Sequence, residues 1–324
     1  MGGWGCGGRW FESSRPDQWF PPDSAAAKGS SMPPAHPVRG VLLCIAALAL
    51  FACMDTSTKY LAQSHSPALI VGVRYLGNLL LMAALLGPTH GCRMVETRRT
   101  ALVVLRAFCL ALASLFIALA LREMPVAETT AILFLAPILL VIAAGPVLGE
   151  RIGPSGWVAT ALGFAGVLAI ARPGSEITGI GMSFALCAVA MNLGYQLLSR
   201  VLAASENTFA LLFYTALAGS ILYGLAMPWL IEDHAPGTLE AALFAGLGVM
   251  GGLGHFLFTA AFRDAPASLL APLNYLQLLW AGLLGYLVFG HVPGAVSLVG
   301  MALIAGSGVL VALKTRRPSP KRTA

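Results

Sequence analysis

Charged residues are scarce in this chain of 324 residues, where Asp, Glu, Lys and Arg together account for only 10%. A soluble globular domain carries about 25% charged residues. The chain therefore lacks the polar surface that a water-facing fold of this length needs. Hydrophobic residues make up 57% of the sequence, and the mean hydropathy is +0.79. The composition excludes the ordinary soluble classes and indicates a membrane protein.

Paired cysteines and acidic metal motifs are also missing. The six cysteines are scattered and form no CxxC pair, so we expect neither a disulfide framework nor a zinc site, and no metal or cofactor. The formal net charge of +6 arises from residues in the tails and short loops. Membrane proteins place positive charge there, so the basic balance does not indicate a nucleic-acid partner.

Long apolar runs are abundant from residue 40 onward. Runs of about 20 residues are long enough to cross a hydrocarbon core about 30 Å thick as helices. We therefore predict an all-α polytopic membrane protein that contacts the lipid bilayer through ten transmembrane helices. Their expected ranges are 40–62, 67–87, 100–121, 125–147, 155–171, 179–200, 208–230, 239–261, 267–289 and 294–313.

The two ends of the chain differ from this apolar part. Residues 1–38 are rich in Gly, Pro, Ser and Trp without periodicity, which is typical of a disordered tail. Residues 314–324 are basic. With the N-terminus inside, fifteen lysines and arginines lie in inner segments, whereas only Arg122 and Arg172 lie in outer loops. This bias predicts that both termini are cytoplasmic.

The sequence of residues 121–150 returns, in altered form, at residues 262–291. Without a gap, Arg122 falls on Arg263, Pro125 falls on Pro266, and both segments end with a glycine and a polar residue. The copies start 141 residues apart, and each half holds five predicted spans. Because five is odd, the second half is expected to be inverted relative to the first. Inverted repeats are typical of secondary transporters, which alternate access to a site near the membrane midplane.

Ionisable side chains within the apolar runs are candidates for function, because a charge in hydrocarbon is costly. Asp55 and Lys59 lie one turn apart on one helical face, and Arg74 lies at a similar depth in the next span. Asp55 and Arg74 either neutralise each other or bind substrate. Three cations, including Arg106, face the two acids Asp55 and Glu128, so a spare positive charge is available for an anionic part of a substrate.

Two of these residues also have structural interpretations. Arg106 lies about two turns from the inner end of its span, where a long side chain can extend to the interface. Glu128 lies in the first turn of its span, where a carboxylate stabilises the helix N-terminus. We nevertheless expect the charged part of a binding site to include Asp55, Lys59, Arg74 and Glu128.

The second half offers neutral polar groups instead of charges. Amides and aromatic rings on helical faces are typical of sites for polar, partly apolar organic molecules. A lone intramembrane histidine, His255, is more often an interhelical hydrogen-bond donor than a proton carrier. The expected polar part of the site is Asn192, Gln196, Tyr214, Asn274, Tyr275 and Gln277.

Two prolines and two polar-poor spans complete the pattern. Pro137 and Pro272 each remove a helical hydrogen bond, and transporters use such breaks where the backbone lines a cavity. Spans 155–171 and 294–313 contain almost no polar side chains. Their spacing of small residues at Ala159/Gly163 and Ala302/Gly306 predicts close packing.

Several phrases resemble the EamA branch of the drug/metabolite transporter superfamily over residues 40–313. These are MDTSTKYLA (54–62), RYL (74–76), LREMPVAETTAILFLAP (121–137), LGERIG (148–153), GFAGVLAIARPG (163–174) and APLNYLQLLWAGLLGYLVFG (271–290). Some phrases look most similar to riboflavin and S-adenosylmethionine uptake members. His291 departs from the acidic residue that often follows the glycine in this family.

The resemblance implies two EamA repeats, residues 39–174 and 175–313, in a bacterial inner membrane. It also implies a central cavity built by spans 1–4 and 6–9, with spans 5 and 10 at the periphery. We therefore expect a secondary transporter for a small-molecule substrate (a vitamin, amino acid, nucleoside-like compound or drug) and not an enzyme. The alternative is a membrane-embedded enzyme acting on a lipid or isoprenoid carrier, for which the sequence lacks paired catalytic groups. The oligomeric state has no signature in the sequence.

Overall fold

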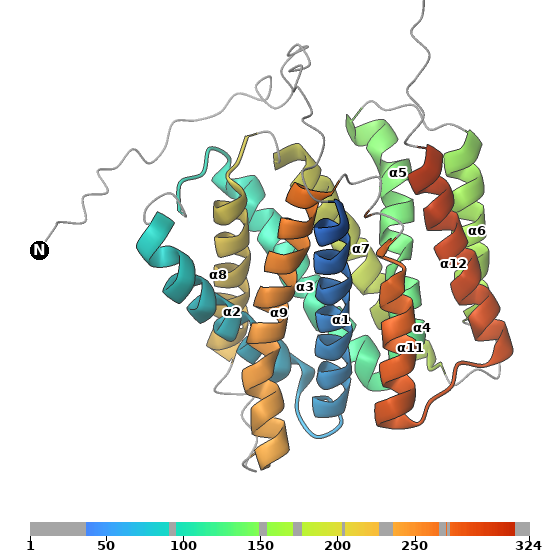
Figure 1. Cartoon of the computed structure of the whole chain (residues 1–324), viewed down its shortest axis with the longest axis horizontal. Helices are drawn as coiled ribbons and strands as arrows, with labels where there is room; N and C mark the ends of the chain where they lie inside the picture. The colour runs from blue at the N-terminus through green and yellow to red at the C-terminus, as the bar shows by residue number, and fades with distance from the viewer. Residues whose placement is uncertain are drawn as a thin grey trace, which may run out of the picture.

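Every regular element in the described part of this computed structural model is an α-helix (Figure 1). The structure describes residues 37–90, 95–148, 154–170, 177–202, 205–226, 236–265, 270 and 273–314. The helices are α1 (Pro37–Leu61), α2 (Pro67–His90), α3 (Thr100–Glu123), α4 (Val126–Leu133), α5 (Leu135–Leu148), α6 (Pro154–Ile170), α7 (Gly179–Leu202), α8 (Thr208–Ala226), α9 (Thr238–Asp264), α11 (Leu276–Phe289) and α12 (Ala295–Lys314).

The helices follow the predicted spans closely. Six of them are long and apolar enough to cross a membrane, and four further apolar segments are shorter: Val126–Leu140, Trp157–Ile170, Leu276–Phe289 and Ala295–Ser307. The all-helical membrane architecture is thus confirmed, whereas the number of ten crossings stays a prediction. Most of the predicted tails 1–38 and 314–324, together with Pro272 and the corner at Gly149 and Glu150, lies outside the described residues.

The predicted span 125–147 is divided into α4 and α5. Pro137 has no N–H to donate to the carbonyl of Leu133 four residues earlier, and α4 ends at that residue. Phe134 joins the two helices with φ of −68° and ψ of −5°, and its N–H bonds to the carbonyls of Thr130 and Ala131. The proline break expected from the sequence is therefore present, three residues before the proline itself.

The contacts between helices stay the same when corresponding helices of the two halves are exchanged, and we call this property the exchange relation. In the first half α1 packs against α9 of the second half, and in the second half α7 packs against α3 of the first. Likewise α2 packs against both α8 and α9, while α3 packs against α8 as well as α7, and α6 pairs with α12. Swapping corresponding helices of the halves leaves this set of pairs unchanged, as a pseudo-two-fold axis between two repeats requires.

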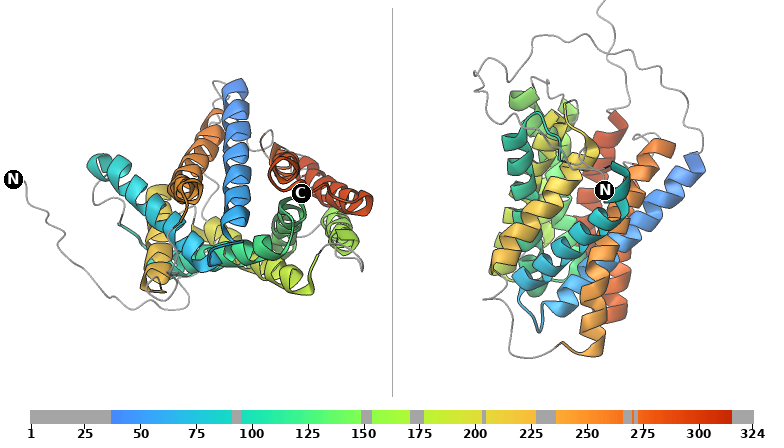
Figure 2. Two further views of the ribbon diagram at one scale, coloured as in Figure 1. Left: turned by 90° about the horizontal axis from the view of Figure 1, so that it is seen from below. Right: turned by 90° about the vertical axis from the view of Figure 1, so that its left-hand side faces the viewer.

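Helices α6 and α12 lie together at one edge of the molecule (Figures 1 and 2). They were expected to pack closely, and they do. The contact is made by Gly166 and Gly300, because a Cβ at Gly300 would come within 2.6 Å of the Gly166 carbonyl oxygen. The predicted pair Ala302/Gly306 is wrong: both residues are exposed, and nothing lies within 4 Å of a Cβ at Gly306. Spacing alone does not reveal which face of a helix meets its neighbour.

Helix α1 begins, and α12 ends, at the same face of the helix layer (Figure 1). The turn between α3 and α4 and the turn between α11 and α12 lie at the opposite face. This arrangement defines two ends of the bundle. We call the first the terminal face and the second the hairpin face.

Candidate functional site

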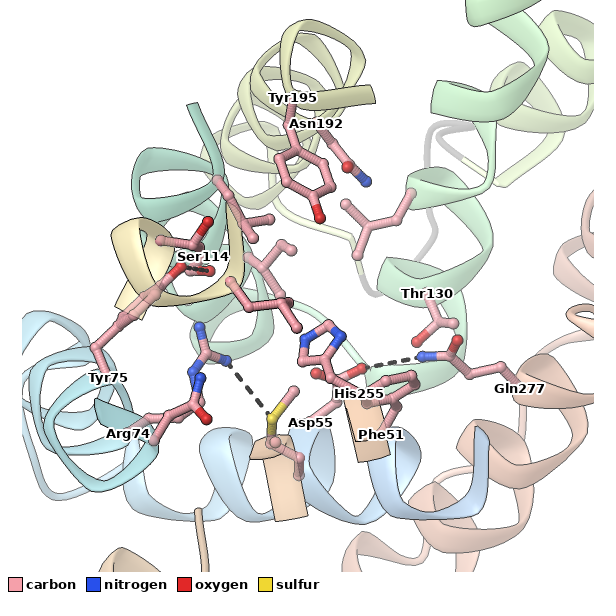
Figure 3. A pocket seen from close by; sticks show the side chains of 18 of the residues that line it. Phe51, Asp55, Arg74, Tyr75, Ser114, Thr130, Asn192, Tyr195, His255 and Gln277 are labelled. Atoms are coloured by element: carbon pink, nitrogen blue, oxygen red, sulfur yellow. Dashed lines mark hydrogen bonds between the residues drawn. The ribbon is translucent and has the colours of Figure 1, made fainter. Parts of the chain in front are cut away.

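A central cavity of about 310 Å³ lies between the two halves of the chain (Figure 3). Residues from α1, α2, α3, α4, α5, α7, α8, α9 and α11 line it, whereas α6 and α12 contribute none of the described lining. This confirms the expectation that spans 1–4 and 6–9 enclose the cavity. The polar lining residues are Asp55, Arg74, Tyr75, Asn78, Ser114, Thr130, Asn192, Tyr195, Thr215, His255 and Gln277.

Asp55 joins the two halves across this cavity. It lies in the C-terminal half of α1 and is almost completely buried, with 8% exposed. The amide Nε2 of Gln277, in the first turn of α11, donates to Asp55 Oδ2 at 3.5 Å. Figure 3 shows this hydrogen bond, and His255, which lines the same cavity, packs on Phe51 with 5.0 Å between ring centroids. A carboxylate from the first repeat and an amide from the second therefore face the same space.

Arg74 approaches the cavity from α2. Its Nη1 lies 3.9 Å from Met54 Sδ, and its guanidinium carbon lies 5.4 Å from the centroid of the Tyr75 ring. Asp55 and Arg74 line the same cavity, but within the described residues they form no ion pair. The two charges are thus close enough to influence one another and are not locked together.

Hydroxyl groups form part of the cavity wall. Tyr75 Oη and Ser114 Oγ are hydrogen-bonded at 3.0 Å between α2 and α3. Thr130 in α4 is 2% exposed, and its Oγ1 has no hydrogen-bond partner among the described residues. Thr130 lies close to the break between α4 and α5, and Leu133, Phe134 and Pro137 of that break also line the cavity. The break therefore brings an irregular backbone segment to the cavity wall.

Arg106 does not extend to the membrane interface, so the structural interpretation given for it from the sequence is wrong. Its side chain is 5% exposed because it points across the bundle toward α7 and α8. It donates to Ser199 Oγ at 2.7 Å, to the Leu211 carbonyl at 3.1 Å, to Thr215 Oγ1 at 3.0 Å and to Tyr195 Oη at 3.0 Å. The position of Arg106 along its own span does not predict these four acceptors, because they come from another part of the chain.

Lys59 and Glu128 lie nearer the hairpin face, outside the described lining. Lys59 Nζ donates to the carbonyls of Leu121 at 2.8 Å and Met124 at 2.7 Å, and lies 5.5 Å from the Phe289 ring centroid. Glu128 is 3% exposed and its Oε1 lies 3.2 Å from His291 Nε2. These contacts join both halves at the hairpin face, and we call Lys59, Glu128, Phe289 and His291 the corner cluster.

The other predicted site residues have different surroundings. Asn192 lines the cavity from α7, whereas the half-buried Gln196, one turn further along, is not in the lining. Tyr214 donates to the Val95 carbonyl at 3.1 Å, away from the cavity. Tyr275 packs on Phe134 with 5.0 Å between ring centroids, and Asn274 Oδ1 is buried without a partner among the described residues.

Sequence reasoning did not select several of the polar groups that line the cavity. These are Tyr75, Asn78, Ser114, Thr130, Tyr195 and Thr215. Hydroxyl groups are common in apolar helices, so most of them carry no signal of their own. The repeat offered one, because Ser114 falls on His255 in the alignment of the two halves, and both residues line the cavity.

Comparisons with known proteins agree with this architecture. The EamA-like transporter family matches residues 38–172 and 179–313. A riboflavin transporter of Rhizobium johnstonii is 29% identical over 59% of this chain and 63% of its own length. An S-adenosylmethionine uptake transporter of Rickettsia bellii is 25% identical over 83% of this chain and 91% of its own length. A riboflavin transporter of Vibrio cholerae is 27% identical over 83% and 91% of the two chains.

A solved crystal structure shares the fold. It superposes with a TM-score of 0.61, at 22% sequence identity, and the match covers 86% of this chain and 98% of the other.

Proposed function

Because this chain belongs to the EamA-like transporter family, we propose that it is a secondary carrier which moves a small organic metabolite across a membrane by alternating access. Family membership, together with relatives named as transporters, identifies it as a multi-pass membrane transporter and not as an enzyme. The alternative of a membrane enzyme acting on a lipid carrier has no support from these relatives. We propose the bacterial inner membrane as its location, with both termini in the cytoplasm.

The observation that carries this proposal is the cavity shared by the two halves. Asp55 and Arg74 come from the first repeat, while Asn192 and Gln277 come from the second. A substrate that contacts all four side chains is held by both repeats at once. Rocking of one repeat against the other would then open the site to one side at a time.

The corner cluster supports alternating access in a specific way. It connects α1, α3 and α4 of the first repeat to the end of α11 and to His291 of the second repeat, all at the hairpin face. We propose that these contacts hold the cavity closed at that face and separate when it opens. Lys59 and Glu128 would then act in the transport cycle without contacting the substrate in this conformation. For the other predicted site residues, substrate binding stays a prediction: Gln196, Tyr214, Asn274 and Tyr275.

The names of the relatives provide the first substrates to test. Riboflavin and S-adenosylmethionine are named for similar proteins, and both are organic molecules with a polar and an apolar part. We propose that the substrate of this chain likewise combines a polar and an apolar part, and that its polar groups lie near Asp55, Arg74 and Gln277.

Uptake measurements test the proposal. Cells with and without the gene are supplied with labelled riboflavin, S-adenosylmethionine, amino acids, nucleosides and phenylacetate, and a gene-dependent change in uptake or release is expected for at least one of them. Asp55→Asn should lower that flux about tenfold or more, because it removes a buried charge that contacts Gln277. Glu96→Gln, at an exposed loop position, is the matched control and should leave the flux unchanged. Folded protein in the membrane that moves none of these compounds would contradict the proposal.

A further inference from the structure

The charges around the central cavity do not balance. Within the described residues, Arg74 and Asp55 line the cavity, and Arg106 lies directly behind its lining residues Tyr195 and Thr215. Two guanidinium groups, which remain charged in proteins, therefore face one carboxylate. An uncompensated charge is costly inside a membrane protein, so a ligand that carries one negative charge would compensate the excess.

Other ionisable groups of the same region do not supply that charge. Glu123 and Glu128 are the acids whose charges act on Lys59, and Glu128 also contacts His291 at 3.2 Å. These groups belong to the corner of the bundle at the hairpin face, where acids and bases compensate one another. The excess positive charge is thus associated with the cavity itself.

The two arginines differ in what they can offer to a ligand. Arg106 has five N–H donors, and four hydrogen bonds to Ser199, Leu211, Thr215 and Tyr195 occupy most of them. Its ring contact with Tyr195, at 4.5 Å from the centroid, fixes it further. Arg106 therefore contributes a positive field and holds Tyr195 and Thr215 in place, which makes it a positioning residue.

Arg74, by contrast, keeps its donors available. Its described side-chain contacts are the thioether of Met54 at 3.9 Å and the neighbouring Tyr75, whose ring and hydroxyl group both lie beside the guanidinium. A thioether is a weak acceptor, so most of the guanidinium fork has no strong partner among the described residues. Figure 3 shows this group beside the open centre of the cavity. A carboxylate fits a guanidinium fork through two parallel hydrogen bonds.

The rest of the lining is apolar and partly aromatic. The apolar side chains around the cavity include Phe51, Leu110, Ile117, Leu133, Phe134 and Leu212. The unpartnered hydroxyl of Thr130 offers one additional polar contact on the side of the cavity where Gln277 lies. A flat apolar body with one polar substituent fills such a space better than a fully polar molecule.

We infer that the central cavity binds an organic monoanion, with a carboxylate on the Arg74 guanidinium and a flat apolar body among the aromatic and aliphatic lining. This inference rests on the proposed function, because it assigns the chemical class of ligand to the same cavity. When a monoanion is bound, its carboxylate and the carboxylate of Asp55 together balance the charges of the two guanidinium groups. A zwitterion leaves one positive charge in excess, and a cation increases the excess to two.

Binding of four probes that share one ring tests the inference. They are phenylacetate, phenylacetamide, phenethylamine and phenylalanine, which are an anion, a neutral amide, a cation and a zwitterion. Affinities of the purified full-length protein in detergent are obtained from the rise of its unfolding temperature with probe concentration. Phenylacetate should bind about tenfold more tightly than phenylacetamide, because hydrogen bonds to charged groups are the stronger ones. A fifth probe, phenyl phosphate, is a dianion and should bind more weakly than phenylacetate.

Two variants locate the effect. Arg74→Gln should lower the affinity for phenylacetate to near that for phenylacetamide and should change the amide affinity much less, and binding of the amide also shows that the variant is folded. Arg74→Lys keeps the charge without the planar fork and should retain an intermediate preference for the anion. Arg39→Gln, which removes an exposed arginine at the start of α1, is the control and should behave as the unchanged protein.

Three results would overturn the inference. They are equal affinities for phenylacetate and phenylacetamide, tighter binding of phenylalanine or phenethylamine than of phenylacetate, and an anion preference that survives Arg74→Gln. Binding of none of the probes would count against the anion site as well. If a metabolite is transported while the anion preference is absent, only this inference fails. If the anion binds but folded protein transports nothing, the proposed function fails instead.

Discussion

Lys59 belongs to the packing of the helix ends in this structure. Its ammonium group binds two carbonyls at the C-terminal end of α3, Leu121 and Met124, which no longer have helical partners there. A positive charge at this position also complements the negative end of the helix dipole. Asp55, one turn earlier in α1, faces the cavity instead. Two charged residues on one face of one helix thus have different partners.

The substitution Lys59→Met tests this structural role. Methionine retains the apolar stem but leaves both carbonyls without the charged donor, and hydrogen bonds to charged groups contribute about 1.5–3 kcal/mol. We expect a lower unfolding temperature in detergent. The control is Arg39→Gln, because Arg39 is 69% exposed in its contact with Asp264 and an exposed pair contributes about 0–1 kcal/mol. Equal stability of the two variants would show that the Lys59 contacts contribute little.

At the scale of elements, two helix features determine where the cavity lies. The break between α4 and α5 places Leu133, Phe134 and Pro137 in the cavity wall. Helices α6 and α12 contribute none of the described cavity lining. They pack against each other instead, through the close contact between Gly166 and Gly300. Small residues at such crossings allow backbones to approach closely.

Adding one methyl group at the α6–α12 crossing tests this account. Gly300→Ala places a Cβ within 2.6 Å of the Gly166 carbonyl oxygen, so the helices must separate, at a cost of about 1–3 kcal/mol. Gly306→Ala on the same helix meets nothing within 4 Å and should be neutral or stabilising, since alanine is the better helix former. Unfolding temperatures of both variants give the comparison. Because neither helix lines the cavity, the folded Gly300→Ala carrier should keep its KM, and a changed KM would contradict the separation of roles.

At the scale of the whole molecule, the exchange relation between the halves is the central property. Exchanging the halves turns the pair α1–α9 into the pair α7–α3, and it turns the pairs α2–α8 and α6–α12 into themselves. The polar groups do not share this relation, because the first repeat supplies Asp55 and Arg74 while the second supplies Asn192, His255 and Gln277. A symmetric scaffold therefore carries an asymmetric site, which is what a substrate with unlike ends requires.

Chemical labelling tests the orientation of this scaffold. In a variant without native cysteines, Gln63→Cys places a thiol in the α1–α2 turn and Glu96→Cys places one between α2 and α3; both positions are exposed. A membrane-impermeant maleimide should label Gln63→Cys in intact cells and Glu96→Cys only after permeabilisation. The reverse pattern would contradict cytoplasmic termini and the charge bias on which they rest.

Local chain properties determined much of this protein in advance. Apolar runs predict the helices without any knowledge of how the helices pack. The duplication of residues 121–150 predicts two related halves, because related sequences form related structures. The same holds for the break near Pro137, since a missing N–H acts on the adjacent turn alone. Asp55 and Arg74 were selected as charges inside apolar runs, and Asn192 and Gln277 were selected as amides on helical faces. All four line the cavity.

Only the tertiary structure decided how the remaining charged residues are used. The partners of Lys59 are 62 and 65 positions away in the chain, and those of Arg106 are 89 to 109 positions away. The same applies to the glycines at the α6–α12 crossing, whose face depends on how each helix is rotated. Sequence spacing specifies which residues share a face, but the rotation and tilt of a helix are set by its neighbours. A buried charge acquires its role from the groups that the fold brings to it.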